Sequence, residues 1–280
     1  MIFVTEKSLM AQLVRKEWFR DWFSSPFYYR LYFERDEKEA EEFIQRLLHF
    51  LQPSAGSRIV DVACGRGRHS CILAKMGFDT TGFDLSFESI EYAKQFENAN
   101  LTFYQHDMRY PFWVNYFDYA FNFFTSFGYF ATRREHDDAI RTIATSLKPG
   151  GIFVMDYLNT HFVEDHLVHN EIKHVAGTAY HIHRWDDETH FYKKVTINDV
   201  SLTAPEEHTE RVAKFSLGDF TDMLSFQNMQ VMEVFGDHNL YPYDVRKTPR
   251  LIIVARKKES NHSGEEKRLY SDGRKTDPLT

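Results

Sequence analysis

The chain has 280 residues, a formal net charge of −7 and 42% hydrophobic residues, which fits one α/β domain with an insertion and a sizeable core. The acidic balance disfavours nonspecific nucleic-acid binding, and we expect neither a membrane span nor a signal peptide from the apolar patterning. The two cysteines, Cys64 and Cys71, predict reduced thiols and a cytoplasmic location.

Residues 1–54 are expected to form a helical N-terminal segment. Apolar residues recur at helical spacing over residues 1–23, and a Ser-Ser-Pro sequence at 24–26 interrupts them. Residues 27–33 are densely aromatic, and most of these rings are expected to pack in the core. Residues 37–51 follow as an amphipathic helix.

Residues 58–76 read as a strand, a tight turn and a helix. Apolar β-branched residues at 59, 60 and 62 predict a strand buried on both faces, and small residues with two glycines at 63–67 predict the turn. A helix over 70–76 would then start beside the strand's carboxyl end. This arrangement favours a nucleoside cofactor site, although an ordinary strand-to-helix turn remains the alternative.

Acidic residues end the next two strands. Asp84 closes the strand 79–84, where a carboxylate can accept hydrogen bonds from both ribose hydroxyls. Ser86, just beyond it, is a candidate helix cap. Asp107 ends a short strand from 101, where it can accept from an adenine amino group while Met108 packs on the ring.

Two more buried strands complete five strand-helix units over residues 56–160. The strand 117–124 carries a polar Asn122 near its end, and a Pro-Gly-Gly turn at 149–151 leads into the fifth strand. The loop 124–129 has small hydroxyls and a glycine, which suit either a plain loop or a site wall. Near-continuous apolar strands predict a parallel sheet with helices on both faces.

Residues 161–214 have a different character. Alternating segments at 180–185 and 190–197 predict antiparallel strands that cover the carboxyl edge as a lid or substrate wall. His181 and His183 share one strand face, as metal ligands can, but no third ligand is evident nearby, so no metal is expected. A Ser-x-x-Asp cap at 216–219 then opens another helix.

These motifs together resemble class I S-adenosylmethionine-dependent methyltransferases of the bacterial small-molecule type, and the Asp-Val-Ala-Cys-Gly core also resembles glycine N-methyltransferase. The resemblance implies an α/β, Rossmann-like, doubly wound, seven-stranded sheet whose last strand is antiparallel, with the antiparallel β insertion added. We therefore expect a core at 55–160 and 215–257, the insertion at 161–214, and, from its charged composition, a disordered tail at 258–280.

The glycine pattern separates two cofactor classes. A dinucleotide fold needs a third glycine beneath the pyrophosphate, and Ser70 occupies that position here. S-adenosylmethionine has no phosphate, so the third glycine is dispensable. Asp61 would repel a pyrophosphate but can help to bind a methionine ammonium group.

The predicted site combines these arguments with the resemblance. The resemblance places Tyr32 at the active site and assigns Ala63, Gly65 and nearby backbone to the methionine part. It also implies a basic residue at position 39, where this chain has glutamate, so that Arg35 and Arg66 are candidate replacements. The full prediction for S-adenosylmethionine, or its product S-adenosylhomocysteine, is Tyr32, Asp61, Ala63, Cys64, Gly65, Arg66, Gly67, Asp84, Leu85, Asp107, Met108 and Asn122.

The acceptor side is predicted less specifically. We expect a small-molecule acceptor, because the chain is acidic and carries its own lid, and no catalytic base is assigned. RNA or protein acceptors, a non-catalytic S-adenosylmethionine-binding module and, last, a dinucleotide oxidoreductase are the alternatives. The sequence leaves the oligomeric state open. The candidate acceptor-pocket residues are Tyr129, Asn159, His183, Tyr241 and Tyr243.

Overall fold

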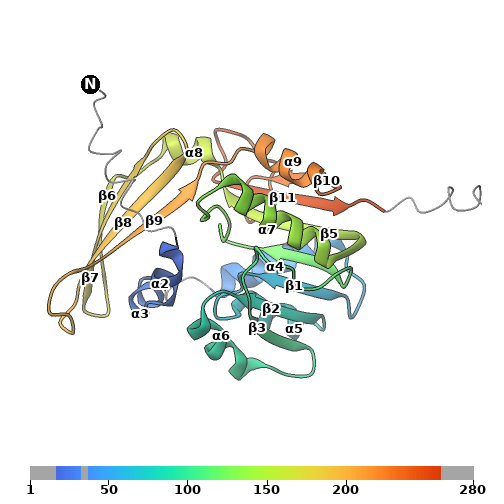
Figure 1. Ribbon diagram of the computed structural model, residues 1–280, viewed down its shortest axis with the longest axis horizontal. Coiled ribbons are helices and arrows are strands. Elements are labelled where there is room, and N and C mark those ends of the chain that lie inside the picture. Colours follow the sequence, from blue (N-terminus) through green and yellow to red (C-terminus); the bar gives the residue numbers. More distant parts are fainter. Residues whose placement is uncertain (1–16, 33–36, 260–280) are drawn as a thin grey trace, which may run out of the picture.

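The computed structural model describes residues 17–32 and 37–259 (Figure 1). Most of the predicted N-terminal helix, Arg35, and the predicted tail from residue 260 onward lie outside the described residues. The N-terminal part that is described forms two short helices, α2 (Trp18–Ser24) and α3 (Pro26–Leu31). Ser25 accepts a hydrogen bond from the backbone N–H of Phe27 and thereby caps α3, so the Ser-Ser-Pro break separates two helices.

The described residues form a main sheet of seven strands in the order β10-β11-β5-β4-β1-β2-β3. The pairs among β1 to β5 are parallel, whereas β11 runs antiparallel to both β5 and β10. The predicted doubly wound sheet with an antiparallel final strand is therefore confirmed. The strands are β1 (Arg58–Val62), β2 (Asp79–Asp84), β3 (Leu101–Gln105), β4 (Phe117–Asn122), β5 (Leu147–Leu158), β10 (Met229–Phe235) and β11 (Arg250–Lys257).

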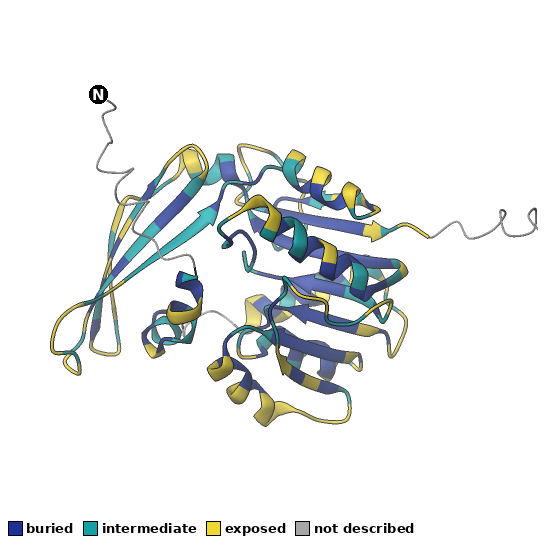
Figure 2. Ribbon diagram, viewed as in Figure 1, coloured by how far each residue is buried: buried dark blue, intermediate teal, exposed yellow. Residues whose placement is uncertain are grey.

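Helices cover both faces of this sheet, because successive apolar residues of each strand point to opposite sides. Ile59 of β1 packs in one cluster with α4 (Glu37–Leu51) and α5 (Arg68–Lys75). Val60 and Val62 pack in another with α7 (Arg133–Ser146) and α9 (Leu217–Phe226). Figure 2 shows the central strands mostly buried, with the exposed stripes of α7 on the outer side.

Smaller elements complete the edge of the sheet near β3. Helix α6 (Phe87–Ala93) and the short 3-10 helix η1 (Lys94–Phe96) lie between β2 and β3. The Ser86 side chain accepts from the backbone N–H of Ser89, which confirms the predicted cap of α6. The cap of α9 is confirmed as well, since Ser216 and Asp219 form a capping box.

The insertion forms a separate antiparallel sheet in the order β6-β7-β8-β9, as predicted. It follows α8 (Thr160–Asp165) and precedes α9. Its inner face belongs to the same apolar cluster as α2 and α3, where Ile182 and Val195 join Trp22 and Leu31. The N-terminal helices thus lie between the two sheets (Figure 1). The strands are β6 (Asn170–Val175), β7 (Thr178–Asp186), β8 (His190–Asn198) and β9 (Glu206–Ala213).

Candidate functional site

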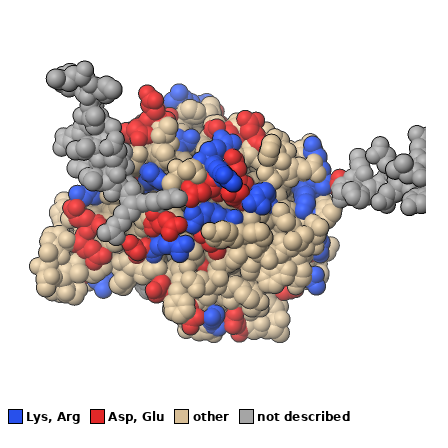
Figure 3. Space-filling model, viewed as in Figure 1, with Lys and Arg blue, Asp and Glu red and all other residues tan. Residues whose placement is uncertain are grey.

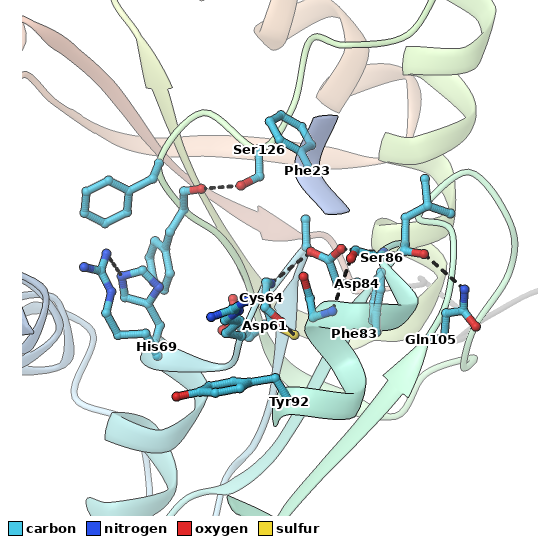
Figure 4. Close-up of a pocket in the computed structure, with 18 of the residues that line it drawn as sticks. Phe23, Asp61, Cys64, His69, Phe83, Asp84, Ser86, Tyr92, Gln105 and Ser126 are labelled. Carbon is cyan, nitrogen blue, oxygen red and sulfur yellow. Dashed lines mark hydrogen bonds between the residues drawn. The ribbon is translucent and has the colours of Figure 1, made fainter. Parts of the chain in front are cut away.

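A cavity of about 1130 Å³ lies at the carboxyl ends of β1 to β4. Its walls come from the turn after β1, the ends of β2 and β3, the loop after β4, helices α2 and α3, and Glu210 on β9. Figure 4 shows Asp61, Cys64 and Asp84 close together in it, with His69 and Ser126 on another side. The switch point of a doubly wound sheet is the expected place for a ligand.

The turn after β1 is shaped by its glycines. Gly65 has φ of +57°, and a Cβ on it would meet no atom within 4 Å, so the turn is open to the cavity at this residue. Gly67 has φ of +81° and caps α5, and a Cβ there would lie 2.5 Å from the ring of Phe103. Gly65 therefore permits close approach of a ligand to the backbone, whereas Gly67 permits packing on β3.

Asp84 joins this turn to the end of β2. Its Oδ2 accepts from the Gly65 backbone N–H at 2.9 Å, and its Oδ1 accepts from the Ser86 N–H at 2.8 Å. Burial raises the pKa of Asp84 above its usual range, and the backbone hydrogen bonds oppose this in part. A carboxylate accepts up to about four hydrogen bonds, so Asp84 retains capacity for two ribose hydroxyls.

Asp61 lies beneath the same turn and is 1% exposed. Ser70 donates its hydroxyl to Asp61 Oδ2 at 2.6 Å. Burial raises the pKa of Asp61 from 3.8 to about 7, although the Ser70 hydrogen bond works in the opposite direction. Ser70, which occupies the position of the third glycine, therefore forms a hydrogen bond with the Asp61 carboxyl. A buried carboxyl beside Asp84 fits a cationic ligand and disfavours a pyrophosphate.

Asp107 and Met108 also line the cavity, but the Asp107 carboxylate already has a cationic partner. Arg109 donates Nη2 to Asp107 Oδ2 at 2.6 Å and Nε to Oδ1 at 3.0 Å. Burial opposes the Asp107 charge, but the hydrogen bonds from Arg109 outweigh it and hold the pKa of Asp107 below its usual range. A ligand amino group at this end would meet a fixed, ionised acceptor.

The structure brings most of the predicted cofactor residues to this cavity. Arg66 lies with its guanidinium 3.5 Å from the Tyr29 ring centroid and 4.6 Å from that of Tyr92. Tyr32 contacts Lys193 of β8 through its hydroxyl. The predicted residues in the cavity wall are Tyr32, Asp61, Ala63, Cys64, Gly65, Arg66, Asp84, Leu85, Asp107 and Met108.

Gly67 and Asn122 are the two predicted cofactor residues outside the cavity wall. Asn122 is fully buried and donates Nδ2 to the Val62 carbonyl at 3.0 Å, which ties β4 to β1. The polar side chain of Asn122 thus forms a contact between two strands and does not line the cavity.

Of the five acceptor-side candidates, only Tyr129 lines the cavity. Asn159 is 1% exposed and donates to the carbonyls of Asp244 and Thr248, and Tyr243 donates to its Oδ1 at 3.3 Å. These residues thus hold the loop before β11. His183 is exposed on β7 and contacts Asn170, and Tyr241 is 64% exposed.

Several cavity residues were not predicted from the sequence. Glu210 reaches the cavity from β9, where its Oε1 accepts from Trp22 Nε1 at 2.7 Å and from Lys193 Nζ at 2.7 Å. The aromatic stretch at 27–33 was assigned mainly to the core, yet Tyr28 and Tyr29 line the cavity. The density of aromatic residues at 27–33 was the available signal, whereas nothing local distinguishes Glu210 from other strand glutamates.

Within residues 17–32 and 37–259, the His, Cys, Asp and Glu side chains form no group of three or more arranged to hold a metal ion. His181 and His183 both lie exposed on β7. No helix of these two ranges combines the length and hydropathy needed to cross a bilayer.

Comparison with known proteins bears on this site. The family described as "Methyltransferase domain" matches residues 53–196. An N,N-dimethyltransferase of dTDP-3-amino-3,4,6-trideoxy-alpha-D-glucopyranose from Streptomyces venezuelae is 34% identical over 113 residues, which cover 40% of this chain and 47% of that protein. Glycine N-methyltransferase from Oryctolagus cuniculus is 27% identical over 150 residues, covering 47% and 50%.

The chain thus spans about half the length of the curated relatives it matches. Among solved structures, an S-adenosylmethionine-dependent methyltransferase from Clostridium acetobutylicum superposes with a TM-score of 0.70 at 16% identity, covering 82% of this chain and 95% of that one. At this identity the superposition supports the fold.

Proposed function

We propose a small-molecule methyltransferase activity for this chain, which belongs to the class I S-adenosylmethionine-dependent methyltransferases. The family predicted from the motifs, its cofactor and the likeness to glycine N-methyltransferase in the cofactor core are confirmed. The cofactor of this family is S-adenosylmethionine. What we propose is the class of acceptor, a small molecule, and the roles of individual residues.

The observation that carries the proposal is a single cavity with two kinds of wall. One is the turn at Gly65 with its hydrogen-bond partner Asp84, and the other is the pair of aromatic helices α2 and α3. Its volume of about 1130 Å³ exceeds the range of roughly 300 to 1000 Å³ typical for one ligand. We assign the half beside β1, β2 and β3 to the cofactor. The half walled by α2, α3, Tyr129 and Glu210 is assigned to the acceptor. Phe124, which stacks on His69 next to the turn after β1, lies on the cofactor side.

The proposed cofactor contacts follow the strand order. Asp84 takes the ribose hydroxyls, Asp107 and Met108 take the adenine, and Asp61 with the open turn at Gly65 takes the methionine part. Tyr32, Ala63, Cys64, Arg66 and Leu85 complete this wall. The bound sulfonium supplies an activated methyl group, so the protein's own residues bind, align and exclude water.

The acceptor is proposed to be a small molecule because the cavity is covered by chain segments. The β6–β9 sheet contributes Glu210 to the wall, and α2 and α3 lie between that sheet and the core. The face seen in Figure 3 has acidic and basic side chains interspersed, unlike the basic stripe typical of nucleic-acid readers. The names of the two curated relatives described above state methylation of small molecules.

The domain division is part of the proposal. Residues 55–160 and 215–257 would form the methyltransferase core, and residues 161–214 the acceptor-side cover. Because α2 and α3 share an apolar cluster with β7 and β8, these two helices of the N-terminal segment are proposed to belong to that cover.

A metabolite screen with methyl-labelled S-adenosylmethionine tests the acceptor class. The proposal expects label in a small molecule and release of S-adenosylhomocysteine. Label found only in RNA or protein would contradict the small-molecule acceptor. Binding of the cofactor without transfer to any class of acceptor would favour a non-catalytic binding module.

A further inference from the structure

The loop after β4 forms one wall of the cavity in an unusual backbone conformation. Phe124 and Thr125 have φ of +55° and +58°, although neither is glycine. Non-glycine residues are strained in this left-handed region, and two in succession persist only where surrounding contacts fix them. Phe123, Phe124 and Ser126 of this loop line the cavity, so the contacts that hold the loop bear directly on its shape.

Those contacts converge on Asp156, a fully buried residue of β5. Asp156 Oδ2 accepts from the Phe124 backbone N–H at 2.9 Å, and the Asp156 carbonyl accepts from the Thr125 N–H at 2.9 Å. From β11, Arg250 donates Nε to Asp156 Oδ1 at 2.7 Å and Nη2 to Thr125 Oγ1 at 3.0 Å. Side chains of two strands thus fix both strained residues, although Asp156 itself does not line the cavity.

His238 completes the cluster from the segment between β10 and β11. Its Nε2 lies 3.1 Å from Asp156 Oδ2, and its Nδ1 lies 3.3 Å from Oε1 of Glu39 on α4. The charged groups that face this imidazole are therefore Asp156, Glu39 and Arg250. Burial disfavours the imidazolium, but the hydrogen bond and charge of Asp156 outweigh it and raise the pKa of His238 above its usual value.

The Phe124 ring carries the effect of this cluster to the turn after β1. One neighbour of the ring is His238, with centroids 4.9 Å apart, and another is His69, stacked at 5.2 Å and 23°. His69 belongs to the first turn of α5 and lines the cavity. A change at Asp156 therefore reaches the cavity through Phe124 and His69, beside β1 and β4.

We propose that Asp156 is a positioning residue which, through Phe124, sets the shape of the cavity end beside β1 and β4. This inference rests on the proposed function, which places the methionine part of the cofactor at this end and the adenosine part beside β2 and β3. Asp156 then governs binding of the methionine part and leaves the adenosine part unaffected.

Two probes separate the two ends of the cavity. S-adenosylhomocysteine occupies both ends, whereas adenosine occupies only the end beside β2 and β3. In calorimetric titrations, Asp156→Asn is expected to weaken S-adenosylhomocysteine about ten-fold, the effect of one charge-assisted hydrogen bond, with adenosine changed by less than about two-fold. His238→Gln, a milder change, is expected to act in the same direction and carries the test if Asp156→Asn does not fold.

Thr160→Val is the matched control, because Thr160 is also buried and loses one hydrogen bond, to the Phe215 carbonyl, away from the loop. It should leave both affinities unchanged. Equal weakening of both ligands by Asp156→Asn, or no change in either, would overturn the positioning role. Failure of the wild type to bind S-adenosylhomocysteine would overturn the proposed function together with this inference, so the two failures are distinguishable.

A pH series adds a readout that general destabilisation does not give. The imidazolium of His238 is the form that pairs with Asp156, so its contribution is complete below the ordinary histidine pKa and is lost as the pH rises through the raised pKa. The affinity difference between wild type and His238→Gln should therefore shrink as the pH rises for S-adenosylhomocysteine and stay near zero for adenosine. A difference that does not change with pH would contradict the role of the charged His238.

Discussion

The Gly65 backbone N–H donates to Oδ2 of Asp84 at 2.9 Å, and this bond joins the turn after β1 directly to the acidic end of β2. The two groups that the proposed cofactor would approach together are thus fixed relative to each other in the protein itself. Such fixed polar groups reduce the cost of ordering a site when a ligand binds.

Replacement of Asp84 tests the ribose contact. Asp84→Ala is expected to weaken S-adenosylhomocysteine by roughly 2 to 4 kcal/mol, because two ribose hydroxyls lose a charged acceptor. Asp84→Asn retains an oxygen for the Gly65 N–H and should cost less. Asp79→Asn, at the exposed start of the same strand, is the control. Titration calorimetry that finds wild-type affinity in a folded Asp84→Ala variant would show that Asp84 serves only the turn.

Asp61 predicts a pH-dependent trade-off between stability and binding. The folded protein holds a proton on Asp61 up to about pH 7, whereas the unfolded chain releases it near 3.8, so rising pH destabilises the fold across this interval. Asp61→Asn removes this penalty, which amounts to at most about 4 kcal/mol at pH 8, from about 1.4 kcal/mol per pKa unit.

Thermal unfolding at pH 4 and pH 8 measures the effect. The stability gained by Asp61→Asn should be larger at pH 8, while its affinity for S-adenosylmethionine falls because the methionine ammonium loses its partner. Equal gains at both pH values would refute the titration of Asp61 in the fold.

Replacement of Arg109, the partner of the cavity residue Asp107, is expected to destabilise the fold more than replacement of an exposed arginine. Arg109 donates to Asp107, to Glu17 Oε1 at 3.0 Å and to Glu135 Oε1 at 3.0 Å. Arg109→Met leaves the buried Asp107 carboxylate without its hydrogen-bonded cation, with Arg20 Nη2 still 3.8 Å away, and should destabilise the fold by about 3 kcal/mol. Arg133→Met, which removes an exposed pair with Asp137, should cost less than about 1 kcal/mol.

Chemical denaturation of the two variants gives this comparison. The pKa of Asp107 is lowered in the fold. The contribution of its ion pair to wild-type stability should therefore be complete above about pH 4 and be lost as the pH falls through the lowered pKa. A loss for Arg109→Met no larger than that for Arg133→Met would mean that the Asp107 pair contributes little.

Glu210 tests the acceptor half of the cavity. Glu210→Gln weakens the contacts to Trp22 and Lys193 and should lower turnover of the acceptor found in the screen by about ten-fold or more, with cofactor affinity within about two-fold. Glu207→Gln is the matched control, because Glu207 pairs with Lys194 on the other face of the same strands. Steady-state kinetics showing equal losses in both variants would remove Glu210 from the acceptor wall.

The sequence predicted the parts of the site that depend on strand order. Asp61, Gly65 and Asp84 lie at the ends of adjacent parallel strands, and parallel strands place their carboxyl ends at one edge, so the structure brings them together. The antiparallel insertion could be predicted as well, because period-two alternation in residues 180–197 is a local property.

Side-chain partners from distant segments could not be predicted in this way. The alternation that identified β7 did not show which face packs inward, and His183 points away from the core while Ile182 packs in it. The cationic partner of Asp156 comes from β11, and Asn159 turned inward to hold the loop before β11. Such contacts depend on tertiary packing, for which single-sequence patterns carry no signal.

Calorimetric titration of the wild-type chain with S-adenosylhomocysteine tests the central claim most directly, since it requires no acceptor. The cavity geometry predicts saturable binding at one site, weakened by Asp84→Ala and unaffected by Asp79→Asn. A chain that binds a nicotinamide dinucleotide but neither S-adenosylmethionine nor S-adenosylhomocysteine would contradict the account.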